Sequence, residues 1–272
     1  MQYERGVSIS KVEYMHIQEV PAGSYNPHPW EISRAHESMA ILHKHFRPLR
    51  KHGQGLCIAD IGAGDMYFAK EYLKNNPQDI VYAIDINYTN LTSAHERIRM
   101  ATRLEDIPDV VFDAVVMMDM FEYIPDEVRF LGQVRDAMRP GGVLYLTLPA
   151  FQFLYSSHDE YVKNLRRYSI RRCRKTINMV DGIRVETVFY FYSMLFFVRA
   201  TKKLLLMATH TDQQKVPFWK YPEDHAVTKG ITALLNADFR LWHGLQRIGL
   251  KLPGLSLCAV CKLKDDTADN RS

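Results

Sequence analysis

The sequence has few cysteines, no long apolar run and no strong excess of either charge. Four cysteines in 272 residues are too few for a disulfide scaffold. The most apolar stretch, residues 188–198, ends at Arg199 and is well short of the ~20 apolar residues that span a bilayer. A net charge of +4 is small for this length, whereas a nucleic-acid-binding protein usually carries a strongly basic stripe. The sequence therefore predicts a protein that neither crosses a membrane nor binds nucleic acid.

The remaining composition is that of a globular protein with a substantial core. Hydrophobic residues make up 47% of the chain and charged residues 24%. No apolar segment follows a basic one within residues 1–15, so we expect no secretory signal. Together with the few cysteines, this favours a reducing, cytoplasmic setting.

From residue 56 onward, short apolar runs alternate with amphipathic segments. Strands are predicted over residues 56–61, 80–86, 112–118 and 141–149. Helices are predicted between them, over residues 66–76, 89–100 and 126–138. Strands separated by helices of this length are typical of βαβ units on a parallel sheet. The fold class is therefore α/β, with a doubly wound, Rossmann-like sheet.

The flanking segments add helices and two further strands. An amphipathic pattern predicts a helix over residues 33–50, before the sheet. After Pro149 we expect helices over residues 170–180, 193–207 and 225–248, and strands over residues 183–192 and 255–263. These segments divide the chain into a helical N-terminal cap (1–55), a cofactor-binding core (56–150) and a substrate region (151–272) that completes the same sheet.

A glycine turn marks the first strand of the core, within the segment CIADIGAGDMYFAKEYL at residues 57–73. Gly62 and Gly64 lie where the strand gives way to the helix, and Asp60 stands two residues earlier. Ligands of open parallel sheets bind at the carboxyl ends of the strands. Glycine there permits a positive φ and lets a ligand contact bare backbone, although it also occurs as simple turn chemistry.

The residues around this turn favour a cationic cofactor over a dinucleotide. The third glycine of a dinucleotide fingerprint is replaced by Tyr67, and Asp65 puts a negative charge where a pyrophosphate would approach. S-adenosylmethionine carries an ammonium and a sulfonium group and no phosphate, so it fits an acidic corner. Asp85 ends the second strand and could accept hydrogen bonds from both ribose hydroxyls of a nucleoside, or cap the next helix instead.

Three segments of the core resemble the class I S-adenosylmethionine-dependent methyltransferases. They are DIGAG at residues 60–64, RLEDIPDVVFDAVVMMDMFEYIPD at 103–126 and MRPGGVLYLTLP at 138–149. The resemblance implies a seven-stranded sheet whose last two strands are antiparallel, with helices inserted between them. It departs from the family pattern at Met66, Arg103 and Tyr123, where a small residue, an Asp and a His are frequent.

The same resemblance implies a set of cofactor-binding residues. The methionine moiety would be surrounded by Asp60, Gly62, Ala63 and Gly64, and the ribose held by Asp85. The adenine would pack on Ile86, lie beside Leu104 and Glu105, and face Met117 and Tyr123. We also expect a lid over the cofactor, or else a helix simply packed on the core, from Tyr25, His28, Trp30 and Arg34.

The loop at residues 150–169 is similar to one in a bacterial subgroup of these enzymes, some encoded near glycosyltransferase and lipid-pathway genes. This implies a small, lipid-like or carrier-bound acceptor in secondary or envelope metabolism, with transfer to oxygen slightly favoured. A hydroxyl acceptor needs a base, and the loop offers His158, Asp159 and Tyr168 as candidate catalytic residues. The alternative is a loop held together by polar contacts.

Three further segments allow more than one interpretation. The basic run at residues 166–175 is either a solvated helix face or a docking surface for an acidic substrate. Residues 188–207 fit a protein core, a peripheral membrane contact or a tunnel for a greasy acceptor. Cys258 and Cys261 lie three apart in a predicted strand, so their side chains point to opposite faces, which favours core packing over a metal site.

Two other functions stay open at this point. An NAD-dependent oxidoreductase is disfavoured by Tyr67 and Asp65. A non-catalytic protein with a methyltransferase-like fold would not require the complete set of Asp60, Gly62, Gly64 and Asp85.

Overall fold

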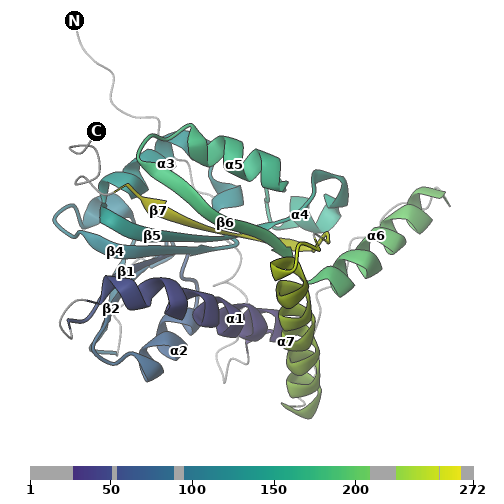
Figure 1. The fold of residues 1–272 in the computed structure, drawn as a ribbon, viewed down its shortest axis with the longest axis horizontal. Coiled ribbons are helices and arrows are strands. Elements are labelled where there is room, and N and C mark those ends of the chain that lie inside the picture. Colours follow the sequence, from purple (N-terminus) through teal and green to yellow (C-terminus); the bar gives the residue numbers. More distant parts are fainter. Residues whose placement is uncertain (1–26, 51–53, 89–94, 209–224, 251, 265–272) are drawn as a thin grey trace, which may run out of the picture.

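The computed structural model describes residues 27–50, 54–88, 95–208, 225–250 and 252–264. Its centre is a single seven-stranded sheet with the strand order β3-β2-β1-β4-β5-β7-β6 (Figure 1). The strands are β1 (Cys57–Ile61), β2 (Ile80–Ile84), β3 (Ile98–Ala101), β4 (Phe112–Met118), β5 (Met138–Pro149), β6 (Ile183–Phe191) and β7 (Ser256–Leu263). The predicted doubly wound α/β fold with seven strands is confirmed.

Among the strands of the described residues, one opposes the direction of the others. Strands β1 to β5 pair in parallel, and β7 is antiparallel both to β5 and to β6. It follows that β6 runs in the same direction as β1 to β5. The expectation that both of the last strands are antiparallel is wrong for β6, because two antiparallel pairings in succession restore the original direction.

Helices cover both faces of the sheet. They are α1 (Pro29–Phe46), α2 (Tyr67–Asn75), α3 (Glu127–Asp136), α4 (Ser157–Tyr161), α5 (Ile170–Asn178), α6 (Ser193–Ala208) and α7 (His225–Arg247). Short 3-10 turns add η1 (Arg47–Leu49), η2 (Leu104–Asp106), η3 (Phe121–Tyr123) and η4 (Gln152–Leu154). In Figure 1, α3 and α5 lie on one face of the sheet and α1 and α2 on the other. Helices α6 and α7 are inserted between β6 and β7, as predicted.

Each face of the sheet has its own apolar core. One core includes Leu131 of α3 and Cys173 and Ile177 of α5, and the other includes Leu42 of α1 and Phe239 of α7. Cys261 belongs to the first core and Cys258 to the second, and both thiols are free and fully buried. The prediction that these two cysteines pack on opposite faces is confirmed.

The predicted helix over residues 89–100 is wrong in its last part. Residues 98–101 form the edge strand β3, which pairs in parallel with β2 and buries Ile98 and Ala101. A strand of four residues is too short to show an alternating pattern, and the polar residues before it imitate an amphipathic helix. Residues 89–94 lie outside the described part of the chain.

Helix α1 begins four residues earlier than predicted. Pro29 occupies its first turn, and His28 caps it by accepting from Trp30 N–H at 3.0 Å while Glu31 accepts from His28 N–H at 3.1 Å. This reciprocal arrangement satisfies two backbone donors that a helix N-terminus otherwise leaves exposed. The proline and its cap thus start the helix before its apolar pattern becomes visible.

The strand order indicates where a ligand is expected to bind. Strand order reverses between β1 and β4, so the loops that follow these two strands diverge above the sheet. Within the described residues, no helix is long and apolar enough to cross a membrane.

Candidate functional site

Three carboxylates meet at the carboxyl edge of the sheet, beside this reversal point. Asp60 is near the end of β1, Asp85 follows β2 and Asp119 follows β4. Because these three strands are neighbours, residues far apart in the sequence converge above one edge.

The glycine turn after β1 is fixed by its contacts with the next strand. Gly62 and Ala63 donate their backbone N–H groups to Ile84 O at 2.8 and 3.3 Å. Gly62 has a φ of +79°, and a Cβ there would lie 2.5 Å from Met120 Cγ. Gly64 has a φ of +51°, and a Cβ there would meet no atom within 4 Å. Packing therefore requires glycine at 62, whereas Gly64 leaves open space above its backbone.

The N-terminus of α2 is already occupied by a carboxylate. Met66 precedes the helix with a φ of +63° and gives no side-chain cap. Asp65 Oδ1 accepts instead from Tyr67 N–H at 3.0 Å. Pyrophosphates bind at free helix N-termini, so this arrangement repels the phosphates of a dinucleotide.

Asp60 is a buried carboxyl group with a strongly raised pKa at this edge. Its side chain is only 2% exposed, and its Oδ2 has no hydrogen-bond partner among the described residues. Burial, together with the negative charges of Asp65 and Asp85, raises the pKa of Asp60 to about 7 against the opposing effect of Arg34. A buried carboxylate without a partner is costly, and a bound cation would supply that partner.

Asp85 connects the second strand to the glycine turn. Its Oδ2 accepts from Gly64 N–H at 3.1 Å, and its Oδ1 accepts from Asn87 N–H at 3.0 Å and Asn87 Nδ2 at 2.9 Å. Tyr88 Oη donates to Gly64 O at 2.5 Å. These contacts orient the carboxylate at the edge of the turn, and Ile86 lies beside it with 38% of its surface exposed.

The other residues assigned to the adenine side differ in their burial and lie on different elements. Leu104 and Glu105 lie on η2, where Leu104 packs against the core and Glu105 accepts from Gln133 Nε2 at 2.9 Å. Met117 is fully buried in β4, next to Ile61 of β1. Tyr123 is half-buried on η3. The structure therefore brings Met117 close to the glycine turn but within the core.

Helix α1 reaches this edge through an ion pair that spans 85 residues. Arg34 donates to Asp119 Oδ2, and Asp119 Oδ1 accepts from Thr147 Oγ1 at 3.2 Å. Burial is the largest single influence and lowers the pKa of Arg34, but Asp119 and Glu31 together with smaller effects outweigh it, so the pKa is raised and Arg34 stays charged. Of the other residues assigned to a lid, Trp30 packs against Tyr192 at 4.4 Å between ring centroids, and Tyr25 lies outside the described residues.

A second buried carboxyl group, Glu122, was not predicted as part of the site. It is 2% exposed, and its Oε2 has no partner among the described residues. Burial and the neighbouring charge of Asp119 raise the pKa of Glu122 well above its usual value. Its only sequence signal is its place in the loop after a buried strand.

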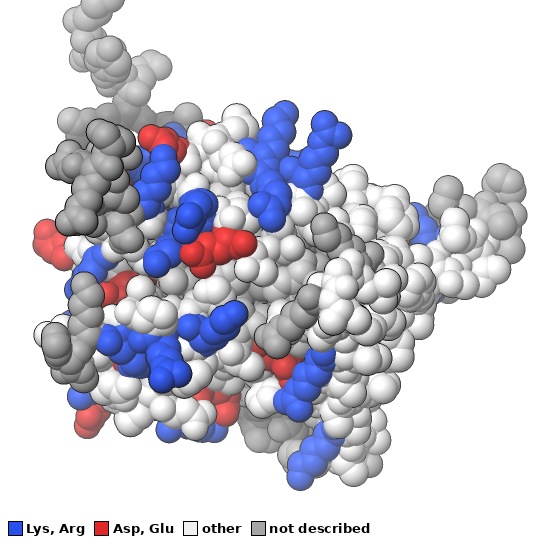
Figure 2. Space-filling model, in the orientation of Figure 1, with Lys and Arg blue, Asp and Glu red and all other residues white. Residues whose placement is uncertain are grey.

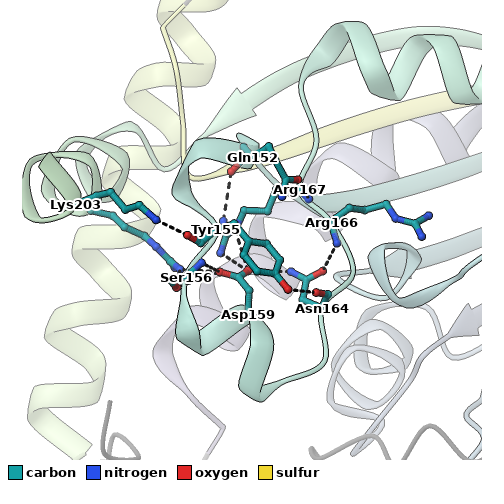
Figure 3. A network of polar contacts seen from close by, with 10 residues as sticks. Gln152, Tyr155, Ser156, Asp159, Asn164, Arg166, Arg167 and Lys203 are labelled. Carbon is teal, nitrogen blue, oxygen red and sulfur yellow. Dashed lines mark hydrogen bonds and ion pairs between the residues drawn. The ribbon is translucent and has the colours of Figure 1, made fainter. Parts of the chain in front are cut away.

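Of the loop residues assigned to catalysis, Asp159 makes its contacts within the loop and with α6. Figure 3 shows Asp159 inside a polar network together with Ser156, Asn164 and Arg167. Asp159 Oδ1 accepts from Arg167 Nε at 2.8 Å and Asn164 Nδ2 at 3.0 Å, and its Oδ2 accepts from Arg199 Nη2 at 3.3 Å. Asp159 is 1% exposed, and these contacts hold the loop to α6.

The other two residues assigned to catalysis, His158 and Tyr168, have different surroundings. His158 is exposed on α4. Tyr168 is fully buried and donates to Glu127 Oε1 at 2.6 Å, and burial together with that carboxylate raises the pKa of its hydroxyl. Part of the basic run is also used in structural contacts, because Arg166 and Arg172 both pair with Glu127 at 2.9 and 3.2 Å.

Comparison with known proteins agrees with this geometry. Residues 59–146 match the family model described as a methyltransferase domain. A malonyl-[acyl-carrier protein] O-methyltransferase of Halalkalibacterium halodurans is 24% identical over 116 residues, which are 38% of this chain and 43% of that protein. A ubiquinone biosynthesis O-methyltransferase of Xanthomonas campestris is 26% identical over 126 residues, which are 41% of this chain and 52% of that protein. The chain thus matches about half the length of these relatives.

The fold comparison extends over most of the chain. The crystal structure of a candidate sarcosine dimethylglycine methyltransferase from Galdieria sulphuraria superimposes with a TM-score of 0.51 at 16% identity, covering 86% of each chain. At this identity the likeness concerns the fold. The family match covers residues 59–146, which include the glycine turn, and it supports a methyltransferase domain of the class that uses S-adenosylmethionine.

The chemistry of the described residues fits that cofactor. The edge carries Asp60, Asp65 and Asp85 around a turn with open space at Gly64, and Asp60 has a buried oxygen without a partner. These features suit a ligand with positive charge and no phosphate.

Proposed function

We propose that the protein transfers the methyl group of S-adenosylmethionine to a small, lipid-like or carrier-bound acceptor, with oxygen the favoured methylated atom. The observation that carries this proposal is the buried carboxyl group of Asp60 beside the glycine turn, whose Oδ2 has no partner among the described residues. Of the two relatives named above, one is named for a carrier-bound acceptor and the other for ubiquinone biosynthesis. Both names specify transfer to oxygen, which supports this acceptor class.

The chain's own residues would hold the cofactor from two sides. Asp60 accepts a hydrogen bond from the ammonium of the methionine moiety, since its free Oδ2 needs a donor. Asp85, already oriented by Gly64 and Asn87, accepts from the ribose hydroxyls. Ile86, which is exposed beside Asp85, would support the adenine. When bound, the cofactor supplies a methyl group activated by a positively charged sulfur.

The remaining residues would close the site to water and position the acceptor. Arg34 and Asp119 hold α1 over the loop after β4, which limits access of water from that side. Transfer requires an acceptor held in line and about 3 Å from the methyl carbon. The contacts of Asp159 and Tyr168 suit them for shaping the acceptor loop, and His158 is the member of that set exposed on its surface.

Label transfer tests this function directly. The protein is incubated with methyl-tritiated S-adenosylmethionine and, separately, an acyl-carrier-bound carboxylate, a quinol-type phenol and a membrane lipid extract. We expect label in one of these acceptors together with release of S-adenosylhomocysteine. Binding of the cofactor without transfer to any of them would favour a non-catalytic protein, and binding of NAD instead would favour an oxidoreductase.

We place this activity in the cytoplasm, with a peripheral contact to the membrane. A lipid-like acceptor would reach the enzyme most readily from a membrane surface.

A further inference from the structure

Helix α6 is amphipathic, but its apolar stripe faces outward, unlike that of an ordinary surface helix. A helix of a globular protein normally turns its apolar stripe inward and its charged residues outward. In α6 two of the three cations face the protein: Arg199 Nη2 donates to Ser156 Oγ at 3.0 Å, and Lys203 Nζ donates to Tyr155 O at 2.5 Å. Several of its large apolar residues are left on the outer face, although Phe196 is buried.

The outer face of α6 carries five large apolar residues along one stripe. Spacings of three, four and seven place them on one side of the helix, with exposed fractions between 36% and 64%: Met194, Phe197, Val198, Leu204 and Leu205. Phe153 on η4 extends the same apolar surface; it is 54% exposed and packs against Phe196 of α6 at 6.1 Å between ring centroids. Contiguous exposed apolar patches often mark a contact with a partner.

Polar contacts prevent α6 from rotating this stripe inward. Asp238 of α7 accepts from the backbone N–H of Met194 at 3.3 Å, at the start of the helix. Arg199 then binds the buried Asp159, and Lys203 binds the loop before α4. Turning the helix would break these contacts and leave Asp159 short of one of its two ion pairs.

The shape and charge of this surface distinguish between possible partners. Figure 1 shows α6 extending away from the body of the protein, and in Figure 2 that projecting lobe is mostly white, with blue and no red. The helix contains no acidic residue, and Lys202 is exposed at the edge of its stripe. A second copy would bring Lys202 against another Lys202, whereas an anionic surface would complement it.

We infer that the outer face of α6 docks onto an anionic lipid bilayer, with the helix lying in the plane of the interface. A helix of 16 residues is about 24 Å long, so the stripe can enter the boundary between headgroups and acyl chains along its whole length. Lys202 would extend to the lipid phosphates while its aliphatic stem rests on the apolar region. This inference goes beyond the proposed methyl transfer and does not depend on it.

Vesicle flotation tests the inference with matched variants. The full chain is mixed with vesicles of phosphatidylcholine alone, or with vesicles that also contain roughly 30% phosphatidylglycerol. The second lipid makes the vesicle surface anionic. We expect the wild type to float with the anionic vesicles. The double variant Phe197→Ser/Leu205→Ser should bind at least about tenfold more weakly, since it removes two large apolar side chains from the stripe. The control Met179→Ser, 61% exposed at the end of α5, should bind as the wild type does.

Further readouts separate membrane docking from dimerisation and from damage to the cofactor site. Lys202→Glu should weaken binding to the anionic vesicles several-fold and leave the phosphatidylcholine result unchanged. Cofactor affinity by calorimetry should be the same in all variants, so a failed methyl-transfer assay would leave this result intact. The inference is overturned if wild type and double variant float equally, if neither binds, or if sedimentation shows a dimer that the double variant dissociates.

Discussion

Replacing Asp60 by Asn should stabilise the protein without cofactor and at the same time abolish tight cofactor binding. Asp60 is buried with an oxygen that has no partner among the described residues, and its pKa is raised from 3.8 to about 7. The folded protein therefore binds this proton more tightly than the unfolded chain does. As pH rises from about 4 to 7, the free energy of unfolding falls, and above pH 7 the full cost of the buried charge is present.

The size of this effect follows from the pKa difference. About three pKa units at about 1.4 kcal/mol each amount to a cost of roughly 4 kcal/mol at pH 8. Asn has the same shape and no charge, so Asp60→Asn should unfold on the order of 10 °C higher than the wild type at pH 8. The difference should nearly vanish below about pH 3, where Asp60 is protonated in both the folded and the unfolded protein. The exposed Asp136→Asn serves as the control, with no change expected at either pH.

Cofactor binding should change in the opposite direction. A charged hydrogen bond contributes about 1.5–3 kcal/mol, so calorimetry should show affinity for S-adenosylmethionine reduced roughly 10- to 150-fold in Asp60→Asn. If Asp60→Asn were less stable than the wild type at pH 8, the charged Asp60 would have hydrogen-bond or ionic partners within the protein. An unchanged affinity would show that Asp60 does not contact the cofactor.

Three other substitutions test separate parts of the account. Asp85→Ala should weaken binding of S-adenosylmethionine at least about tenfold, and unchanged calorimetric affinity would refute its assignment to the ribose. Gly62→Ala should destabilise the fold by about 1–3 kcal/mol in urea titrations, because its Cβ would meet Met120 and its φ is +79°; wild-type stability would contradict this packing. Asp159→Ala should cost about 3–5 kcal/mol, because it leaves Arg167 buried and unpaired; a fully stable but inactive variant would instead support a catalytic role.

The parts of the site that were predictable are those set by local chemistry. The two glycines, Asp60 and Asp85 lie at strand ends that short apolar runs already reveal, and their positions follow from the general geometry of parallel sheets. The opposed packing of Cys258 and Cys261 was predictable for the same reason, since alternation along a strand is local.

The parts that were not predictable depend on charges paired over long distances in the sequence. Asp119 meets Arg34 across 85 residues, and Asp159 meets Arg199 across 40. Sequence spacing alone suggested a His–acid pair at residues 158 and 159, because nothing local shows which partner a carboxylate finds after folding. The outward stripe of α6 was similarly hidden, since periodicity gives an apolar face but not the direction in which it points.

A crystal structure of the protein with S-adenosylhomocysteine bound would test the central claim most directly. We predict the amino group of the ligand within hydrogen-bond distance of Asp60 and its ribose hydroxyls on Asp85, above the glycine turn. A ligand bound elsewhere, with Asp60 still lacking a partner, would contradict the account.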